Sequence, residues 1–187
     1  MKKYFIALGS NLETQNLSRL EIINRAMGYL SQNNIILVKV SSFWESGSYP
    51  DRTQPDFINA VVEVHSELNP YQVLLELKNI EKKMGRKKKN RWGNRVLDLD
   101  IIGSGSIILP NKFEFNKWLK MPLHKQIKIQ PDELILPHPR IQDRLFVLNP
   151  LNEVAPHWTH PVFNKTPLEL INRKIWGKEN FLKKLEN

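Results

Sequence analysis

The order of the hydrophobic patterns along the chain is the strongest constraint on its fold. The run from Lys3 to Leu8 is almost continuously apolar, which is typical of a strand buried on both faces. Apolar residues then recur at helical spacing from Leu17 to Leu30, with Asn16 as the candidate N-cap. Two segments rich in β-branched and aromatic residues follow, Ile35 to Trp44 and Phe57 to Val64, and we expect both to be strands.

A second helix and a fourth strand complete this pattern. Asn69 and Pro70 suit the N-cap and the first position of a helix that should end at Gly85. Arg95 to Ile102 then alternates apolar and polar side chains, as a strand does. The resulting order predicts an α+β fold with a ferredoxin-like βαββαβ core. In such a core we expect an antiparallel sheet with the helices packed on one face, and a functional site on the open face.

The pattern weakens after this core. We interpret Gly103 to Ser106 as a hinge that opens an insertion, residues 103–132, in which aromatics, lysines and prolines show no periodicity. The insertion carries five aromatic or long apolar side chains, so we expect it either to fold back on the body or to bind a partner, while remaining dispensable for chemistry. A C-terminal extension follows, with a short helix around Leu151 to Val154 and a last helix from Thr166 and Pro167. With 187 residues, we expect one domain that spans residues 1–187.

Composition narrows the class of protein. The chain has no cysteine, which excludes disulfide scaffolds and thiolate metal sites and favours a cytoplasmic location. The first ten residues imitate a signal peptide, but their apolar run stops at Leu8, so we expect a strand instead. No stretch approaches the roughly 18 apolar residues of a membrane span. We therefore expect a cytoplasmic monomer with no membrane partner.

The positive charge is concentrated in one segment. The net charge is +9, and Lys82 to Arg95 alone contains eight basic residues and no acidic one. Such a run can bind RNA, a membrane surface or the phosphates of a nucleotide, or can simply be a solvated loop. Its position directly before an acidic strand favours the nucleotide.

Two carboxylates on that strand suggest a metal. Asp98 and Asp100 should project from one face while Leu97, Leu99 and Ile101 are buried on the other. Neighbouring carboxylates repel each other and are best tolerated with a cation between them, and an all-oxygen pair suits Mg²⁺ bound to phosphate. An edge strand with a solvated acidic face is the alternative.

Other functions compatible with the fold lack their signatures. An RNA-binding module would need an aromatic-rich run on a central strand, which Phe57 to Val62 does not supply. A two-metal phosphohydrolase would need further clustered ligands beyond Asp98 and Asp100. A P-loop kinase would need Gly-x-x-x-x-Gly-Lys-Ser/Thr, which does not occur in the sequence.

Four separated stretches resemble the 6-hydroxymethyl-7,8-dihydropterin pyrophosphokinase (HPPK) family: Ala7–Leu12, Gln54–Val61, Glu81–Ile102 and Leu136–Leu151. The family transfers a pyrophosphoryl group from ATP to the hydroxymethyl oxygen of a reduced pterin, releases AMP and serves folate biosynthesis. The resemblance implies that this chain is such an ATP- and Mg²⁺-dependent transferase. Its expected partners are ATP and 6-hydroxymethyl-7,8-dihydropterin, without nucleic acid.

The resemblance also implies roles for individual residues. Asp98 and Asp100 would hold two Mg²⁺ ions that come with ATP, and Arg86 and Arg95 would be catalytic beside them. Five further residues match ATP-binding positions: Glu81, Lys88, Trp92, His138 and Arg144.

At pterin-binding positions the chain offers aromatic rings and one amide. Phe57 and Phe146 match the positions that stack on the pterin, and Asn59 matches the side chain that hydrogen-bonds its ring. The loop from Ser46 to Tyr49 would add backbone groups. Asn59 is more informative than the two rings, because an amide in a strand can offer a ligand both a donor and an acceptor.

Overall fold

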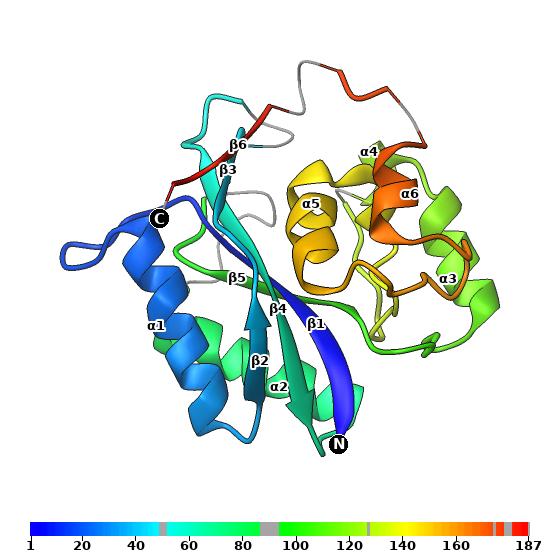
Figure 1. The fold of residues 1–187 in the computed structure, drawn as a ribbon, viewed down its shortest axis with the longest axis horizontal. Helices are drawn as coiled ribbons and strands as arrows, with labels where there is room; N and C mark the ends of the chain where they lie inside the picture. The colour runs from blue at the N-terminus through cyan, green and yellow to red at the C-terminus, as the bar shows by residue number, and fades with distance from the viewer. Residues whose placement is uncertain (49–51, 87–93, 127, 174, 178–180, 187) are drawn as a thin grey trace.

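The computed structural model describes residues 1–48, 52–86, 94–126, 128–173, 175–177 and 181–186. Within these residues the chain forms a mixed α/β fold around a six-stranded sheet, and every strand pairing is antiparallel. The strands are β1 (Lys2–Ser10), β2 (Ile36–Val40), β3 (Trp44–Ser46), β4 (Phe57–Ser66), β5 (Asp98–Gly103) and β6 (Leu182–Lys184). They run in the order β5-β1-β4-β3-β6, and β2 pairs with β4 (Figure 1).

Both faces of the sheet are covered by helices. On β1, Tyr4, Ile6 and Leu8 pack with buried residues of α1 (Arg19–Gln32) and α2 (Pro70–Lys83). Phe5 points the opposite way and is buried with Val61 against α5 (Leu145–Val154) and α6 (Pro167–Ile171). Figure 1 shows α1 and α2 on one side of the sheet and α5 and α6 on the other.

The prediction that helices pack on one face only is therefore wrong. Phe5, Val61 and Ile102 give the second face an apolar surface that favours burial, and α5 covers it with Val147, Leu148 and Leu151. The same contacts account for the almost continuous apolar run of the first strand. Helix α5 is also longer than the predicted short helix, since it begins at Leu145.

The ends of the helices follow local sequence signals. Helix α2 begins at the predicted cap, because the Asn69 side chain accepts a hydrogen bond from the backbone N–H of Gln72 and Pro70 occupies the first turn. The chain leaves this helix with Gly85 at a positive φ of 89°. The predicted cap of α1 is wrong: Ser18 and Glu21 form the capping box there, and Asn16 does not.

The predicted strand from Ile35 to Trp44 is two strands. Strands β2 and β3 pair with different halves of β4, with a shift of register between Leu37 and Lys39. Between them Ser41 interrupts the edge by exchanging hydrogen bonds with Val61: its N–H donates to the Val61 carbonyl, and its hydroxyl accepts from the Val61 N–H. The short strand β3 is thereby set beside the end of β4 that carries Phe57 and Asn59.

Residues 103–132 pack on the body of the molecule. They contain α3 (Lys112–Lys120) and α4 (Leu123–Gln126), and the 3₁₀ helix Ile141–Asp143 follows further along the chain. Phe115 and Trp118 of α3 are buried in a cluster with Ile135. The segment therefore folds back on the rest of the chain, which is one of the two expected outcomes.

The interpretation of Gly103 to Ser106 as a hinge is wrong. Gly103 is the last residue of β5 and is buried against the ring of Trp158. The Ser104 hydroxyl donates to the Lys3 carbonyl over 2.8 Å, and the Trp158 indole N–H donates to the Gly105 carbonyl over 2.9 Å. These contacts fix the start of the segment.

Candidate active site

A cleft of about 700 Å³ lies on the face of the sheet that also carries α5. Three neighbouring strands line it with alternate residues: Gly9 of β1, Phe57 and Asn59 of β4, and Asp98 and Asp100 of β5. Because side chains alternate along a strand, these residues share one face while Leu97 and Leu99 are buried on the other. His138, Arg140 and residues 143–147 form another wall. The strand alternation predicted from the sequence is confirmed.

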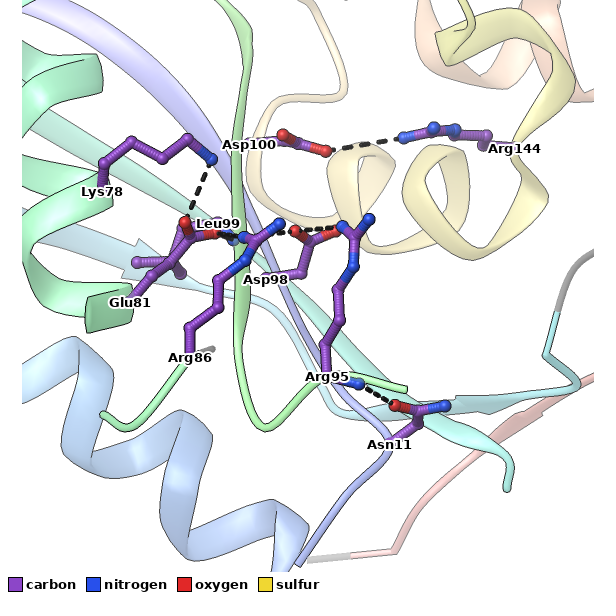
Figure 2. Close-up of polar contacts among 9 residues, drawn as sticks. All are labelled: Asn11, Lys78, Glu81, Arg86, Arg95, Asp98, Leu99, Asp100 and Arg144. Carbon is purple, nitrogen blue, oxygen red and sulfur yellow. Dashed lines mark hydrogen bonds and ion pairs between the residues drawn. The ribbon is translucent and has the colours of Figure 1, made fainter. Parts of the chain in front are cut away.

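Three arginines converge on the two carboxylates. Asp98 Oδ1 accepts hydrogen bonds from Arg86 Nη1 over 2.9 Å and from Arg95 Nη1 over 2.5 Å. Asp100 Oδ2 lies 3.7 Å from Arg144 Nη1, which approaches from the other wall (Figure 2). Burial lowers the pKa of Arg86, but Asp98, Glu81 and Asp100 outweigh it and raise that pKa above its ordinary value. The site therefore holds fixed positive charge next to its carboxylates.

Glu81 lies behind the cleft rather than in its lining. Its side chain is almost fully buried and accepts a hydrogen bond from the backbone N–H of Leu99 over 2.8 Å, between the two aspartates. It also contacts Arg86, and Lys78 Nζ lies 3.1 Å from its Oε2. Burial raises the pKa of Glu81, while Lys78 and Arg86 act in the opposite direction. Glu81 thus joins α2, Arg86 and the backbone of β5 (Figure 2).

Asn11 holds the start of the acidic strand. Its Oδ1 accepts a hydrogen bond from the Arg95 backbone N–H over 2.7 Å, and its own N–H donates to the Arg95 carbonyl over 3.1 Å. The Nδ2 group donates to Asn94 Oδ1 and to the Pro55 carbonyl. The turn after β1 therefore positions the Arg95 backbone for the contact with Asp98.

His138 adds a neutral imidazole ring to the lining of the cleft. Its Nδ1 accepts a hydrogen bond from the Arg140 backbone N–H over 3.1 Å, which leaves the proton of the neutral ring on Nε2. Burial, together with the charges of Arg144 and Arg140, holds the pKa of His138 well below its usual range. The ring therefore stays uncharged at neutral pH.

The other end of the cleft combines aromatic rings with one oriented amide. Phe57 and Phe146 line it with Ser46 and Asn59. The Asn59 amide nitrogen donates to Ser46 Oγ over 2.9 Å and to the Trp44 carbonyl over 3.2 Å. Among the described residues the structure records no donor to Asn59 Oδ1. The amide is thus held with its oxygen available to a ligand.

The structure brings together most of the predicted site residues. Those that line the cleft are Ser46, Phe57, Asn59, Arg86, Arg95, Asp98, Asp100, His138, Arg144 and Phe146. Glu81 lies behind them, and Tyr49, Lys88 and Trp92 fall outside the described residues.

Several lining residues were missed at the level of sequence. Lys78 and Arg140 line the cleft, and both lie next to predicted residues, one helical turn before Glu81 and two residues after His138. Gln130 and Pro131 also line it, although they belong to the predicted insertion, which was expected to contribute no site residue. Nothing in their sequence context distinguishes them, because the fold alone brings them to the cleft.

The carboxylates do not form a complete metal cage. Within the described ranges, no group of three or more His, Cys, Asp or Glu residues is arranged to hold a metal ion.

None of the helices in the described part of the chain has the length and apolar character that a membrane span requires.

Comparison with known proteins decides the family. The model of the family 7,8-dihydro-6-hydroxymethylpterin-pyrophosphokinase (HPPK) matches residues 5–156. The chain belongs to this family. It is 38% identical over 152 residues to the 2-amino-4-hydroxy-6-hydroxymethyldihydropteridine pyrophosphokinase of Haemophilus influenzae, a match that covers 81% of this chain and 80% of that protein. The predicted family and enzyme are confirmed: the chain is a pyrophosphokinase of folate synthesis.

More distant relatives extend the comparison. The Aquifex aeolicus enzyme of the same name is 30% identical over 183 residues, covering 98% of this chain and 95% of that protein. Solved structures of an HPPK-DHPS in complex with substrates and of wild-type Plasmodium falciparum HPPK-DHPS match with TM-scores of 0.65 and 0.63 at 16% and 17% identity. Both matches cover 92% of this chain but less than half of the solved chain. Because the sequence identity is so low, they support the fold alone.

Proposed function

We propose that pyrophosphoryl transfer takes place in this cleft, with the triphosphate of ATP at Asp98 and Asp100 and the pterin at Phe57 and Asn59. The observation that carries this proposal is that one cleft joins a carboxylate pair surrounded by arginines to an aromatic end with an oriented amide. A Mg²⁺-bound polyphosphate needs the first end, and a flat heterocycle with hydrogen-bonding edges suits the second.

The carboxylate pair fits Mg²⁺ by its donor set. Asp98 and Asp100 offer oxygen ligands from one strand face, and an ion held by two carboxylates takes the rest of its shell from phosphate and water. We propose that the pair holds two such ions together with ATP. When bound there, Mg²⁺ supplies neutralisation and alignment of the reacting phosphates.

The arginines supply the remaining electrostatic stabilisation. Arg86, Arg95 and Arg144 contact the carboxylates in the structure, and each lines the cleft. With Mg²⁺ held by the two aspartates, these guanidinium groups would bind phosphate oxygens, which an arginine can contact with two parallel hydrogen bonds. His138 offers its Nε2–H from the other wall without adding charge. These groups stabilise charge that develops during transfer.

Glu81 has a positioning role in this account. It accepts from Leu99 N–H and contacts Arg86, so it sets both the strand between the aspartates and one phosphate-binding arginine. We therefore propose an indirect role for Glu81 in ATP binding, in place of the direct contact that the resemblance implies.

The pterin end recognises shape and hydrogen bonding. Phe57 and Phe146 provide ring surface for stacking, which favours a flat heteroaromatic ligand. Asn59 Oδ1 can accept from a ring N–H or amino group, because the Asn59 nitrogen is already engaged by Ser46 and Trp44. The hydroxymethyl group of the bound pterin would then point toward the phosphates.

The reaction at this site is an in-line displacement. The pterin hydroxymethyl oxygen attacks the β-phosphorus of ATP and releases its proton to solvent, while the bond between the β-phosphorus and the bridging α,β-oxygen breaks and AMP leaves. Positioning of the two substrates accounts for much of the acceleration, since the protein need not form a covalent intermediate.

We also propose a specific topology for the core of the sheet. The strand order, with β5 and β4 flanking β1 and with β2 and β3 along the outer edge of β4, supports a ferredoxin-like core followed by a C-terminal extension. We also propose one domain over residues 1–187, with 103–132 as an insertion. The cytoplasmic location and the monomeric state of the protein remain predictions.

A direct assay tests the proposal. Purified protein is incubated with ATP and 6-hydroxymethyl-7,8-dihydropterin, with and without Mg²⁺, and AMP and the pterin diphosphate are quantified. We expect equal amounts of both products with Mg²⁺ and none after chelation. Formation of ADP in place of AMP, or turnover that ignores the pterin, would contradict the proposed reaction.

A further inference from the structure

The C-terminal segment adds a strand to the part of the sheet that bears the pterin end of the cleft. Strand β6 pairs antiparallel with β3, with Leu182 opposite Ser46 and Lys184 opposite Trp44 (Figure 1). The Leu185 N–H continues the ladder by donating to the Phe43 carbonyl over 2.9 Å. This segment lies beyond residues 5–156, where the family model matches, so the match assigns it no role.

Side chains fasten this strand to the body. Lys184 Nζ lies 2.9 Å from Glu153 Oε1 of α5, and the other oxygen of Glu153 accepts the Ser42 N–H over 2.6 Å. The same ammonium group lies 5.7 Å from the centre of the Trp44 ring. Although burial opposes it, the contacts with Lys184 and Ser42 lower the pKa of Glu153, so this carboxylate is charged at neutral pH. Strand β6 is therefore docked at the edge of β3.

The docking places an aromatic ring at the cleft. Phe181 directly precedes β6, and the antiparallel register that sets Leu182 opposite Ser46 carries Phe181 alongside Gly47. Phe181 lines the cleft together with Ser46, Phe57 and Phe146, while about half of its side chain, 53%, remains exposed. A large apolar side chain left half exposed at the rim of a cleft gains burial when a flat ligand enters.

We propose that Phe181 is a pterin-binding residue of this enzyme, delivered to the cleft by pairing of β6 with β3. The inference rests on the proposed function, since it assumes that the pterin occupies the end of the cleft bounded by Phe57 and Asn59. Phe181 adds a third aromatic surface there, beside Phe57 and Phe146. Strand β6 also supports β3, whose Ser46 hydroxyl and Trp44 carbonyl orient the Asn59 amide.

Binding measurements on single variants test this assignment. The dissociation constant of 6-hydroxymethyl-7,8-dihydropterin is measured by calorimetry with a non-hydrolysable ATP analogue and Mg²⁺ present. We expect Phe181→Ala to raise it about three- to tenfold, the range for loss of one aromatic contact, and Phe181→Tyr to leave it within about twofold. The analogue itself should bind Phe181→Ala as it binds the wild type.

Two further variants separate this inference from the proposed function. Phe113→Ala removes an exposed aromatic side chain of α3 that does not line the cleft, and it should leave pterin binding unchanged. Phe57→Ala removes a ring that the proposed function places on the pterin. If Phe57→Ala weakens binding and Phe181→Ala does not, the role of Phe181 is refuted while the proposed function stands. If neither variant weakens pterin binding, the pterin lies elsewhere, and both the role of Phe181 and the proposed function are wrong. If Phe181→Ala weakens the binding of pterin and of the ATP analogue equally, a pterin-specific role of Phe181 is also refuted.

Discussion

At the scale of single residues, the polar side chains of the cleft differ in how many of their hydrogen-bonding atoms other protein groups already occupy. Asn59 shows this division clearly: its nitrogen is engaged by Ser46 and Trp44, and its oxygen faces a position where a ligand can donate. Glu81 shows the opposite case, because both of its oxygens are engaged by protein groups. We propose that residues of the first kind bind substrate and that residues of the second kind position those that do.

The division at Asn59 leads to a prediction for pterin affinity. Asn59→Ala removes the acceptor and leaves a pterin donor unpaired, so pterin binding should weaken by about 1–3 kcal/mol. Binding of an ATP analogue with Mg²⁺ should not change. Calorimetry on the variant checks both values, and Asn16→Ala, an exposed amide that caps no helix, is the matched control. Equal loss of both ligands would show that the substitution disturbs the fold instead.

At the scale of the elements, the end of β5 is held by close packing as well as by strand pairing. A Cβ atom at Gly103 would lie 2.8 Å from Cζ2 of Trp158. The Trp158 ring is held in place, since its N–H donates to Gly105 and it makes a T-shaped contact with Phe5, with 5.4 Å between ring centres. The glycine therefore permits the contact between the sheet and the segment that follows α5.

A pair of glycine substitutions tests this packing. Gly103→Ala should lower the free energy of unfolding by about 1–3 kcal/mol, as overpacking of a core does. Gly28→Ala should raise it by about 0.5–1 kcal/mol, because this helical glycine is exposed and has no heavy atom within 4 Å of an added Cβ. Urea denaturation measures both. A neutral Gly103→Ala would mean that Trp158 adapts readily and does not fix the end of β5.

The predictability of the elements follows from the range of the interactions that define them. The cap at Asn69 and the alternation of Asp98 and Asp100 depend on a few adjacent residues, and both are evident in the sequence. The division of β2 from β3 depends on Ser41 pairing with Val61, twenty residues away, so the local sequence alone does not establish it. The cover of α5 over the second face depends likewise on Phe5 and Ile102, which are distant in sequence.

The candidate site shows the same limit. The alternation of a strand is enough to suggest the aspartate pair, whereas Arg86, Arg95 and the rings of Phe57 and Phe146 are suggested by their places in the stretches that resemble the family. Asn11 positions Arg95 across 84 residues, and Gln130 reaches the cleft only through the fold, so neither could be assigned a role from the sequence.

At the scale of the whole molecule, His160 joins the segment that contains α3 to the C-terminal part of the chain. It is fully buried, its Nδ1 accepts from the Val162 and Phe163 N–H groups, and its ring lies 5.8 Å from that of Phe115. Within the described residues its Nε2 has no hydrogen-bond partner. Burial lowers the pKa of His160 to about 4, so the folded protein holds the ring neutral.

His160 makes stability depend on pH in a defined direction. Its pKa in the unfolded chain is about 6.5. Between that value and 4 the unfolded chain binds a proton that the folded protein does not, so stability falls as the pH is lowered through this window, by up to about 3 kcal/mol. In His160→Phe this part of the pH dependence should be absent, whereas in a variant of the exposed His157 it should persist. Parallel wild-type and His160→Phe stability curves from pH 7 to 4.5 would contradict this role.

The central claim is that Asp98 and Asp100 together hold the metal-bound triphosphate during transfer. The most direct test is the turnover of Asp98→Asn and of Asp100→Asn with saturating ATP, pterin and Mg²⁺, beside Asp132→Asn as an exposed control that does not line the cleft. We expect each cleft variant to fold and to lose turnover about a thousandfold, as removal of a major electrostatic group does, and the control to retain it. Near-normal turnover in either cleft variant would contradict the assignment of that carboxylate to the metal.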